Sequence, residues 1–147
     1  MDAYIDYYTL PVLVIGAFLG LCIGSFLNVV IYRLPIMWKR RQAEKAGAPP
    51  QPVFNLAVPR SACPRCGHFL RARENVPVVG WVFLRGKCHH CHNPISIRYP
   101  AVELFTCLTF VGIAHAFGFD MKTPVAWIFA CVVIAGICIL YDSRRTQ

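Results

Sequence analysis

Three long apolar segments dominate the pattern of hydrophobic and polar residues along the chain. Residues 11–32 contain no charged side chain over 22 positions, long enough for a helix to cross a hydrocarbon core about 30 Å thick. Residues 101–119 carry one charge, Glu103, near their start, and residues 124–141 carry none over 18 positions. The pattern predicts three transmembrane helices.

The segment between the first two apolar stretches has a different pattern. It is rich in bases and prolines, and its apolar run at 76–83 is short and interrupted by Pro77 and Gly80. We therefore expect turns and short strands here, with Pro35 ending the first helix. The predicted fold is a mainly α-helical membrane protein with a small polar insert. Its predicted parts are a first transmembrane helix in 1–35, a basic linker and insert in 36–100, and the second and third helices in 101–147.

Composition supports a membrane protein. The chain is 56% hydrophobic with a mean hydropathy of +0.49, more apolar than a soluble domain of 147 residues. Twelve of the 15 Lys and Arg lie between Arg33 and Arg98, against two acids, Glu44 and Glu74, which gives this segment a net charge of +10. Basic loops remain in the cytoplasm, so we expect a cytoplasmic insert and an N-terminus on the outer side. Topology and contact with membrane lipid then account for the bases, and no nucleic-acid partner is expected.

Four cysteines in the insert form two Cys-x-x-Cys pairs, Cys63 with Cys66 and Cys88 with Cys91, separated by 21 residues. Paired thiolates of this kind suit a tetrahedral Zn²⁺ ion, and the spacer is long enough for a hairpin, as in a zinc ribbon. Two redox-active or disulfide-bonded pairs are the alternative, although a reducing cytoplasm favours metal. Four histidines stand nearby and are expected to surround the ligands rather than to replace a sulfur: His68, His89, His90 and His92.

Small and polar residues in the first apolar segment predict which of its faces contact other parts of the protein. Gly16, Gly20 and Gly24 fall on one helical face, where they would let another helix of the same bundle approach closely; a dimer contact is the alternative. Asn28 is a polar side chain within the span, so we expect it to face protein and to form a hydrogen bond.

Two acids lie near the ends of the later spans. Glu103 is expected in the first turn of the second helix, stabilised by the helix N-terminus or by Arg98, with a catalytic role as the alternative. Asp142 directly follows the third span and precedes Arg144 and Arg145, which is typical of a membrane boundary.

Four stretches together carry a resemblance to a known family: GSFLNVVIYRLP (24–35), CPRC (63–66), ENVPVVGWVFLRGKCHHC (74–91) and ISIRYPAVE (95–103). In this combination and order they resemble the bacterial type IV prepilin peptidases, the leader peptidase/N-methyltransferases of type IV pilus and type II secretion systems. The resemblance implies a multi-pass protein of the bacterial inner membrane, with a periplasmic N-terminus and a cytoplasmic cysteine domain. It also implies prepilin or pseudopilin substrates, cleaved after a Gly and then methylated with S-adenosylmethionine.

The same resemblance implies an aspartic protease with two catalytic aspartates. Asp142 matches the position of the first, after a transmembrane helix, whereas the Gly-x-Gly-Asp motif of the second does not occur in these 147 residues. We therefore expect the N-terminal portion of such an enzyme, as a fragment or a truncated gene product, inactive alone. Nothing in the sequence marks where S-adenosylmethionine binds.

Two other classes of function remain open at this point. One is a membrane-anchored zinc-ribbon adaptor that binds a protein partner without catalysis. The other is a membrane-tethered zinc module that binds nucleic acid through its bases. It is the less favoured class, because the positive-inside rule already accounts for those bases.

Overall fold

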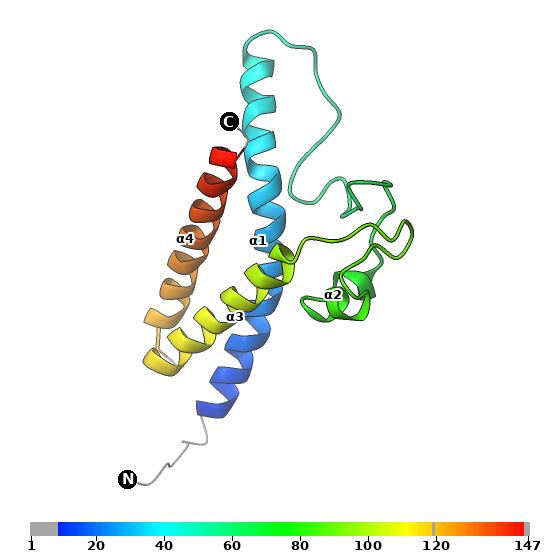
Figure 1. Cartoon of the computed structure of the whole chain (residues 1–147). Coiled ribbons are helices and arrows are strands. Elements are labelled where there is room, and N and C mark those ends of the chain that lie inside the picture. Colours follow the sequence, from blue (N-terminus) through cyan, green and yellow to red (C-terminus); the bar gives the residue numbers. More distant parts are fainter. Residues whose placement is uncertain (1–8, 119, 146–147) are drawn as a thin grey trace, which may run out of the picture.

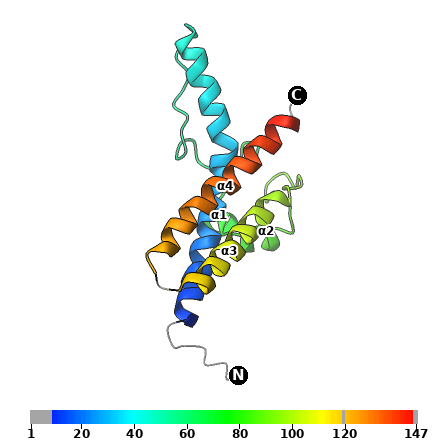
Figure 2. The same ribbon diagram turned by 90° about the vertical axis from the view of Figure 1, so that its left-hand side faces the viewer.

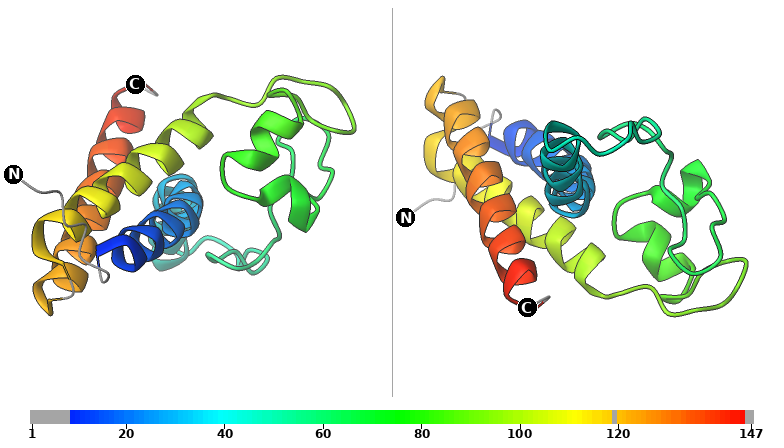
Figure 3. Two further views of the ribbon diagram at one scale, coloured as in Figure 1. Left: turned by 90° about the horizontal axis from the view of Figure 1, so that it is seen from below. Right: turned by 90° about the horizontal axis from the view of Figure 1, so that it is seen from above.

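Three long helices and a small insert make up the chain. The computed structural model describes residues 9–118 and 120–145. The long helices are α1 (Thr9–Lys45), α3 (Arg98–Phe117) and α4 (Lys122–Arg145), and the insert contributes the 3₁₀ helix η1 (Ala72–Asn75) and the short helix α2 (Val79–Phe83). All three long helices are apolar enough and long enough to cross a membrane, which confirms the predicted helical class. The insert and α4 lie on opposite sides of α1 (Figures 1 and 3).

Glycines bring α1 and α3 into backbone contact where the two helices cross (Figure 2). A β-carbon on Gly20 would lie 2.6 Å from the Cα of Cys107, and one on Gly24 would lie 2.8 Å from the Cα of Glu103. Gly16 faces the Ala114 side chain in the same way, at 3.3 Å. The glycine stripe therefore packs within one bundle, as expected, because no side chain larger than hydrogen fits at its centre.

Asn28 also confirms its prediction. Its side-chain amide donates a hydrogen bond of 3.0 Å to the carbonyl oxygen of Tyr99, near the start of α3. A polar group within an apolar span is thereby satisfied by the neighbouring helix rather than exposed to lipid.

The interior of the bundle lies between α3 and its two neighbours. Phe110 and Thr106 are fully buried, and the Phe110 ring stacks on Trp127 of α4 with 4.8 Å between ring centroids. The Trp127 indole N–H donates to the Phe110 carbonyl oxygen at 3.1 Å. Large apolar side chains on the outer faces are exposed, among them Phe18 of α1 and Phe129 of α4, as suits helices surrounded by lipid.

The expected end of the first helix at Pro35 is wrong, because α1 continues through this proline to Lys45. A proline inside a helix costs about 3 kcal/mol or more through its missing N–H and its ring. Contacts with the returning linker support the extension. Arg33 donates to the carbonyl oxygens of Asn55 at 2.8 Å and Pro59 at 2.6 Å.

Phe54 of the linker provides the second support for the extension of α1. Its ring lies beneath the guanidinium groups of Arg33 and Arg40, at 5.5 and 4.5 Å from the ring centroid. These two arginines are two helical turns apart on one face, so a single aromatic side chain contacts both.

The strands expected in the insert are also absent from the described residues, which contain there only two isolated bridges, Ala62 with Phe69 and Lys87 with Pro94. The segment between the cysteine pairs is helical instead of a hairpin. Hydrogen bonds from the Gly80 N–H to the Val76 carbonyl and from the Leu84 N–H to the Gly80 carbonyl close successive helical turns. An isolated two-stranded hairpin is only marginally stable, and the described residues contain no neighbouring sheet to support one. The local hydrogen bonds of a helix form instead.

Candidate functional site

The four cysteines predicted as metal ligands come together at one point of the insert. Their sulfur atoms all lie within 4.8 Å of one another. Across the two pairs, Cys63 Sγ lies 3.8 Å from Cys91 Sγ, and Cys66 Sγ lies 4.0 Å from Cys88 Sγ. A zinc–sulfur bond of about 2.3 Å places the sulfurs of a regular tetrahedron about 3.8 Å apart. With all separations at or below 4.8 Å, the sulfur cluster is close in size to a tetrahedral zinc site and could hold a metal ion.

The two pairs are built as matching turns. The Cys63 N–H donates to the His68 carbonyl at 2.9 Å, and the Cys88 N–H donates to the Asn93 carbonyl at 2.8 Å. The residue after each second cysteine has a left-handed backbone, with φ of 71° at Gly67 and 55° at His92. Each turn thus presents two sulfurs to the same point, although only the first has the glycine that this conformation favours.

Backbone and amide groups around the sulfurs prepare some of them for ionisation. The side chain and backbone of Asn93 lower the pKa of Cys91 to about 6, and the backbone N–H of Cys66 lowers the pKa of Cys63. For Cys66 the backbone N–H of His68 lowers the pKa, but burial and the other sulfurs outweigh it and raise the pKa to about 12. Four adjacent thiols cannot all ionise without a compensating positive charge, and a divalent cation would supply it.

The neighbouring histidines lie around this cluster. Within the described part of the chain, the candidate ligand group contains the four cysteines and no histidine. The rings of His68 and His90, one from each turn, stack with 5.3 Å between centroids and 10° between planes. The stacked rings thus join the two turns to each other.

Glu74 organises the segment between the two turns. Its carboxylate accepts a hydrogen bond of 3.0 Å from the Arg71 N–H, which starts η1 and lowers the pKa of Glu74. The side chain is buried, and a β-carbon on Gly80 would collide with the Glu74 carbonyl oxygen. The close approach therefore requires glycine at residue 80 and brings α2 directly against η1.

Glu103 attaches the insert to the bundle. Its carboxylate accepts a hydrogen bond of 2.6 Å from the Val78 N–H, the residue before α2. The expected placement in the first helical turn is wrong, because α3 begins at Arg98 and Glu103 falls in the second turn. A partnership with Arg98 is not found either, since that guanidinium contacts another acid.

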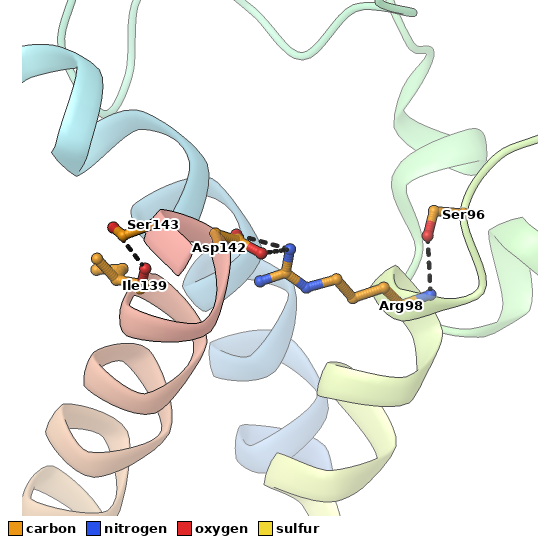
Figure 4. Close-up of polar contacts among 5 residues, drawn as sticks. All are labelled: Ser96, Arg98, Ile139, Asp142 and Ser143. Atoms are coloured by element: carbon orange, nitrogen blue, oxygen red, sulfur yellow. Dashed lines mark hydrogen bonds and ion pairs between the residues drawn. The ribbon is translucent and has the colours of Figure 1, made fainter. Parts of the chain in front are cut away.

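That acid is Asp142, the candidate catalytic residue near the end of α4. Nη1 of Arg98 lies 2.6 Å from Oδ1 and 2.7 Å from Oδ2 of Asp142, and both side chains are partly exposed (Figure 4). The backbone N–H of Arg98 donates to the Ser96 hydroxyl at 3.3 Å, and the Ser143 hydroxyl donates to the Ile139 carbonyl at 3.0 Å (Figure 4). The start of α3 and the end of α4 thus meet at one polar edge of the bundle.

Comparison with known proteins identifies the family. The profile described as the Bacterial Peptidase A24 N-terminal domain matches residues 18–117, well over half of the chain. The chain belongs to this family. A prepilin leader peptidase/N-methyltransferase of Burkholderia pseudomallei (strain 1026b) is 54% identical over 109 residues, covering 68% of this chain and 35% of that protein. The Pseudomonas aeruginosa protein of the same name is 46% identical over 126 residues, covering 81% and 43%.

A third relative, the type 4 prepilin-like proteins leader peptide-processing enzyme of Escherichia coli O78:H11, is 44% identical over 122 residues, covering 78% of this chain and 45% of that enzyme. The chain therefore spans less than half the length of these curated relatives. No solved structure matches it. The A24 N-terminal domain match includes all four cysteines and Glu103 but ends before α4, so Asp142 lies beyond it.

Sequence reasoning missed two of these contacts for identifiable reasons. The Arg98–Asp142 pair joins residues 44 positions apart, and no local pattern marks it. The bond from Val78 to Glu103 uses a backbone N–H, which every residue except proline possesses. A signal existed only for the carboxylate: an acid inside an apolar span needs a polar partner.

Proposed function

We propose that this chain forms the N-terminal part of a type IV prepilin leader peptidase/N-methyltransferase in a bacterial inner membrane. The insert would lie in the cytoplasm and the N-terminus in the periplasm, according to the distribution of bases. Prepilins or pseudopilins of a type IV pilus or type II secretion system would be the substrates. Support comes from the family match together with relatives whose names state both activities.

One observation supports a catalytic role for Asp142. Its carboxylate stands at the polar edge of the bundle, held on both oxygens by Nη1 of Arg98, with the side chain 37% exposed. An aspartic protease needs one carboxylate as base on water and a second, protonated one to polarise the scissile carbonyl. Asp142 would supply one of these. The other would come from a Gly-x-Gly-Asp motif outside these residues, so the 147 residues alone are expected to leave prepilin uncleaved.

Two cofactors belong to the proposal. Zn²⁺ would be held by Cys63, Cys66, Cys88 and Cys91, where it would fix the fold of an insert that has little core of its own. S-adenosylmethionine would donate the methyl group, as the resemblance to the family implies; the relatives' names state an N-methyltransferase activity. We assign no residue to its binding.

A complementation experiment tests the role of Asp142. The chain is expressed in membranes with the remaining C-terminal part of the Pseudomonas aeruginosa relative, a prepilin and S-adenosylmethionine, and the pilin is weighed by mass spectrometry. We expect a shortened, methylated pilin from the pair and intact prepilin from the Asp142→Asn variant. Asp120→Asn, at the opposite end of α4, is the matched control and should retain cleavage. Cleavage by Asp142→Asn at the unsubstituted rate would refute the assignment.

A membrane-anchored adaptor that binds prepilin without cleaving it is the second candidate. It is favoured by the lack of a Gly-x-Gly-Asp sequence in these 147 residues. Prepilin that co-purifies with the chain, and stays intact even when the C-terminal part of the relative is present, would support the adaptor over the peptidase.

A further inference from the structure

The short helix α2 presents an apolar face that the insert does not cover. Val79, Val82 and Phe83 lie three and four residues apart, hence on one side of the helix, and are 62%, 60% and 80% exposed. The opposite side is occupied: Gly80 is buried, and Trp81 donates from its indole to the Ile95 carbonyl at 3.1 Å. The uncovered side chains therefore form a distinct surface, here called the α2 face (Val79, Val82 and Phe83).

The position of α2 along the bundle places this face at membrane depth. The residue before α2, Val78, bonds to Glu103, whose backbone in turn packs on Gly24. Gly24 lies within the apolar segment 11–32, about 12 Å along the helix axis from Tyr32 at 1.5 Å per residue. Figures 1 and 2 show that α2 lies level with the N-terminal half of α3 and does not project beyond the N-terminus of that helix. This depth does not depend on which side of the membrane the insert occupies.

The charges around α2 match the same environment. Four exposed bases flank the helix in sequence, whereas the one acid of this stretch, Glu74, is buried against the Arg71 backbone. Segments that combine an apolar face with adjacent bases bind at the interface of anionic bilayers. The bases are Arg71, Arg73, Arg85 and Lys87.

We propose that the α2 face inserts into the lipid of the bilayer that the long helices cross, with the flanking bases on anionic headgroups. The Val78–Glu103 bond would hold the face at this depth. The insert would then be anchored in the bilayer by α2 instead of projecting from the membrane on a linker. A second protein segment on the α2 face is the competing occupant.

Site-specific photocrosslinking tests the proposal. The full chain, carrying p-benzoylphenylalanine at Phe83, is reconstituted in vesicles of phosphatidylglycerol and phosphatidylethanolamine, illuminated and analysed for lipid adducts by mass spectrometry. Phe129, exposed on α4, is the lipid-facing control, and Val53, 73% exposed in the linker, is the water-facing control. We expect adducts at Phe83 comparable with those at Phe129 and about tenfold above those at Val53.

The same experiment can overturn each part of the proposal. A lipid-adduct yield at Phe83 no higher than at Val53 would refute insertion, and crosslinks from Phe83 to a second polypeptide in place of lipid would assign the face to a protein partner. Replacing phosphatidylglycerol by phosphatidylcholine should lower the yield at Phe83 and leave that at Phe129 unchanged. Equal Phe83 yields in both lipid mixtures would refute the role given to the flanking bases.

Discussion

The helical bundle and the cysteine insert use different means to hold a chain together. In the bundle, α1 and α3 meet backbone to backbone at Gly20 and Gly24, and the Phe110 side chain between α3 and its neighbours is fully buried. In the insert, large apolar residues such as Phe69 and Phe83 are exposed. Among the described residues of the insert, Cys88 is the one buried hydrophobic residue. The bundle is stabilised by packing, whereas we expect the insert to be stabilised by a link between its two cysteine turns.

Size explains this difference. A segment as small as the insert cannot bury enough apolar surface to offset the entropy of ordering its backbone, so such segments require metals or other crosslinks. Helices in lipid have no equivalent need, because their backbone hydrogen bonds are satisfied within each helix and close packing joins them.

Removal of two sulfurs should have the largest effect on stability, and this effect should be confined to the insert. We expect Cys63→Ser combined with Cys66→Ser to abolish metal binding, because a structural zinc site contributes about 10 to 16 kcal/mol. The insert should then become sensitive to proteases while the three helices remain inserted. Metal content by elemental mass spectrometry and the fragments from limited proteolysis provide the readout.

A matched double substitution controls for the loss of thiols. Cys22→Ser combined with Cys107→Ser removes two cysteines of the bundle, neither of which belongs to the sulfur cluster. It should leave the metal content and the protease resistance of the insert as they are. Equal metal content in both double variants would disprove the assignment of the zinc ligands.

Overpacking the bundle should destabilise the helices and leave the metal site of the insert intact, the reverse of what we expect from the cysteine substitutions. Gly20→Val places a branched side chain where even a β-carbon lies 2.6 Å from the Cys107 backbone, and we expect a loss of about 3 kcal/mol in the free energy of unfolding. Gly112→Val, on a part of α3 with open space around the glycine, is the control and should cost much less. Unfolding in mixed detergent micelles measures both variants, and the bound metal should stay constant in each.

The two cysteine turns differ at one position that allows a finer test. Gly67→Ala should destabilise the insert by about 1 kcal/mol, because its φ of 71° is unfavourable for a residue with a β-carbon. His92→Gly, at φ of 55° in the matching turn, should stabilise the insert by a similar amount. Competition with a zinc chelator reports both changes. A result of the same sign for the two variants would contradict the correspondence between the turns.

The ion pair between Arg98 and Asp142 should contribute least to stability. Both side chains are more than a third exposed, and such pairs are worth about 0 to 1 kcal/mol. A double-mutant cycle with Arg98→Gln and Asp142→Asn should therefore give a small coupling energy in unfolding experiments. A coupling well above 1 kcal/mol would show that the bundle depends on this pair for its stability.

How far the sequence predicts each region follows from the range of the interactions. The three spans, the glycine stripe and the hydrogen bond of Asn28 were predictable, because hydropathy and helical spacing are local properties. The sulfur cluster was predictable for the same reason, as two short turns bring four ligands together. The zinc itself and the catalytic role of Asp142 stay predictions.

Two parts of the fold were not predictable from local sequence: the continuation of α1 beyond Pro35 and the helical spacer of the insert. The passage of α1 through Pro35 depends on Arg33 and Arg40 meeting Phe54 of the linker, and local rules would end the helix at the proline. The helical spacer of the insert arises where a hairpin would have had no sheet to join. At Pro35 tertiary contacts outweighed the local preference, whereas in the spacer the local hydrogen bonds of a helix prevailed.

The most direct test of the account is the metal content and sulfur coordination of the purified whole chain. Elemental analysis combined with X-ray absorption at the zinc edge should give one zinc ion per chain with four sulfur neighbours at about 2.3 Å. Chain purified under reducing conditions that is folded and resists proteolysis in the insert without bound metal, or a zinc ion with nitrogen neighbours in place of sulfurs, would contradict it.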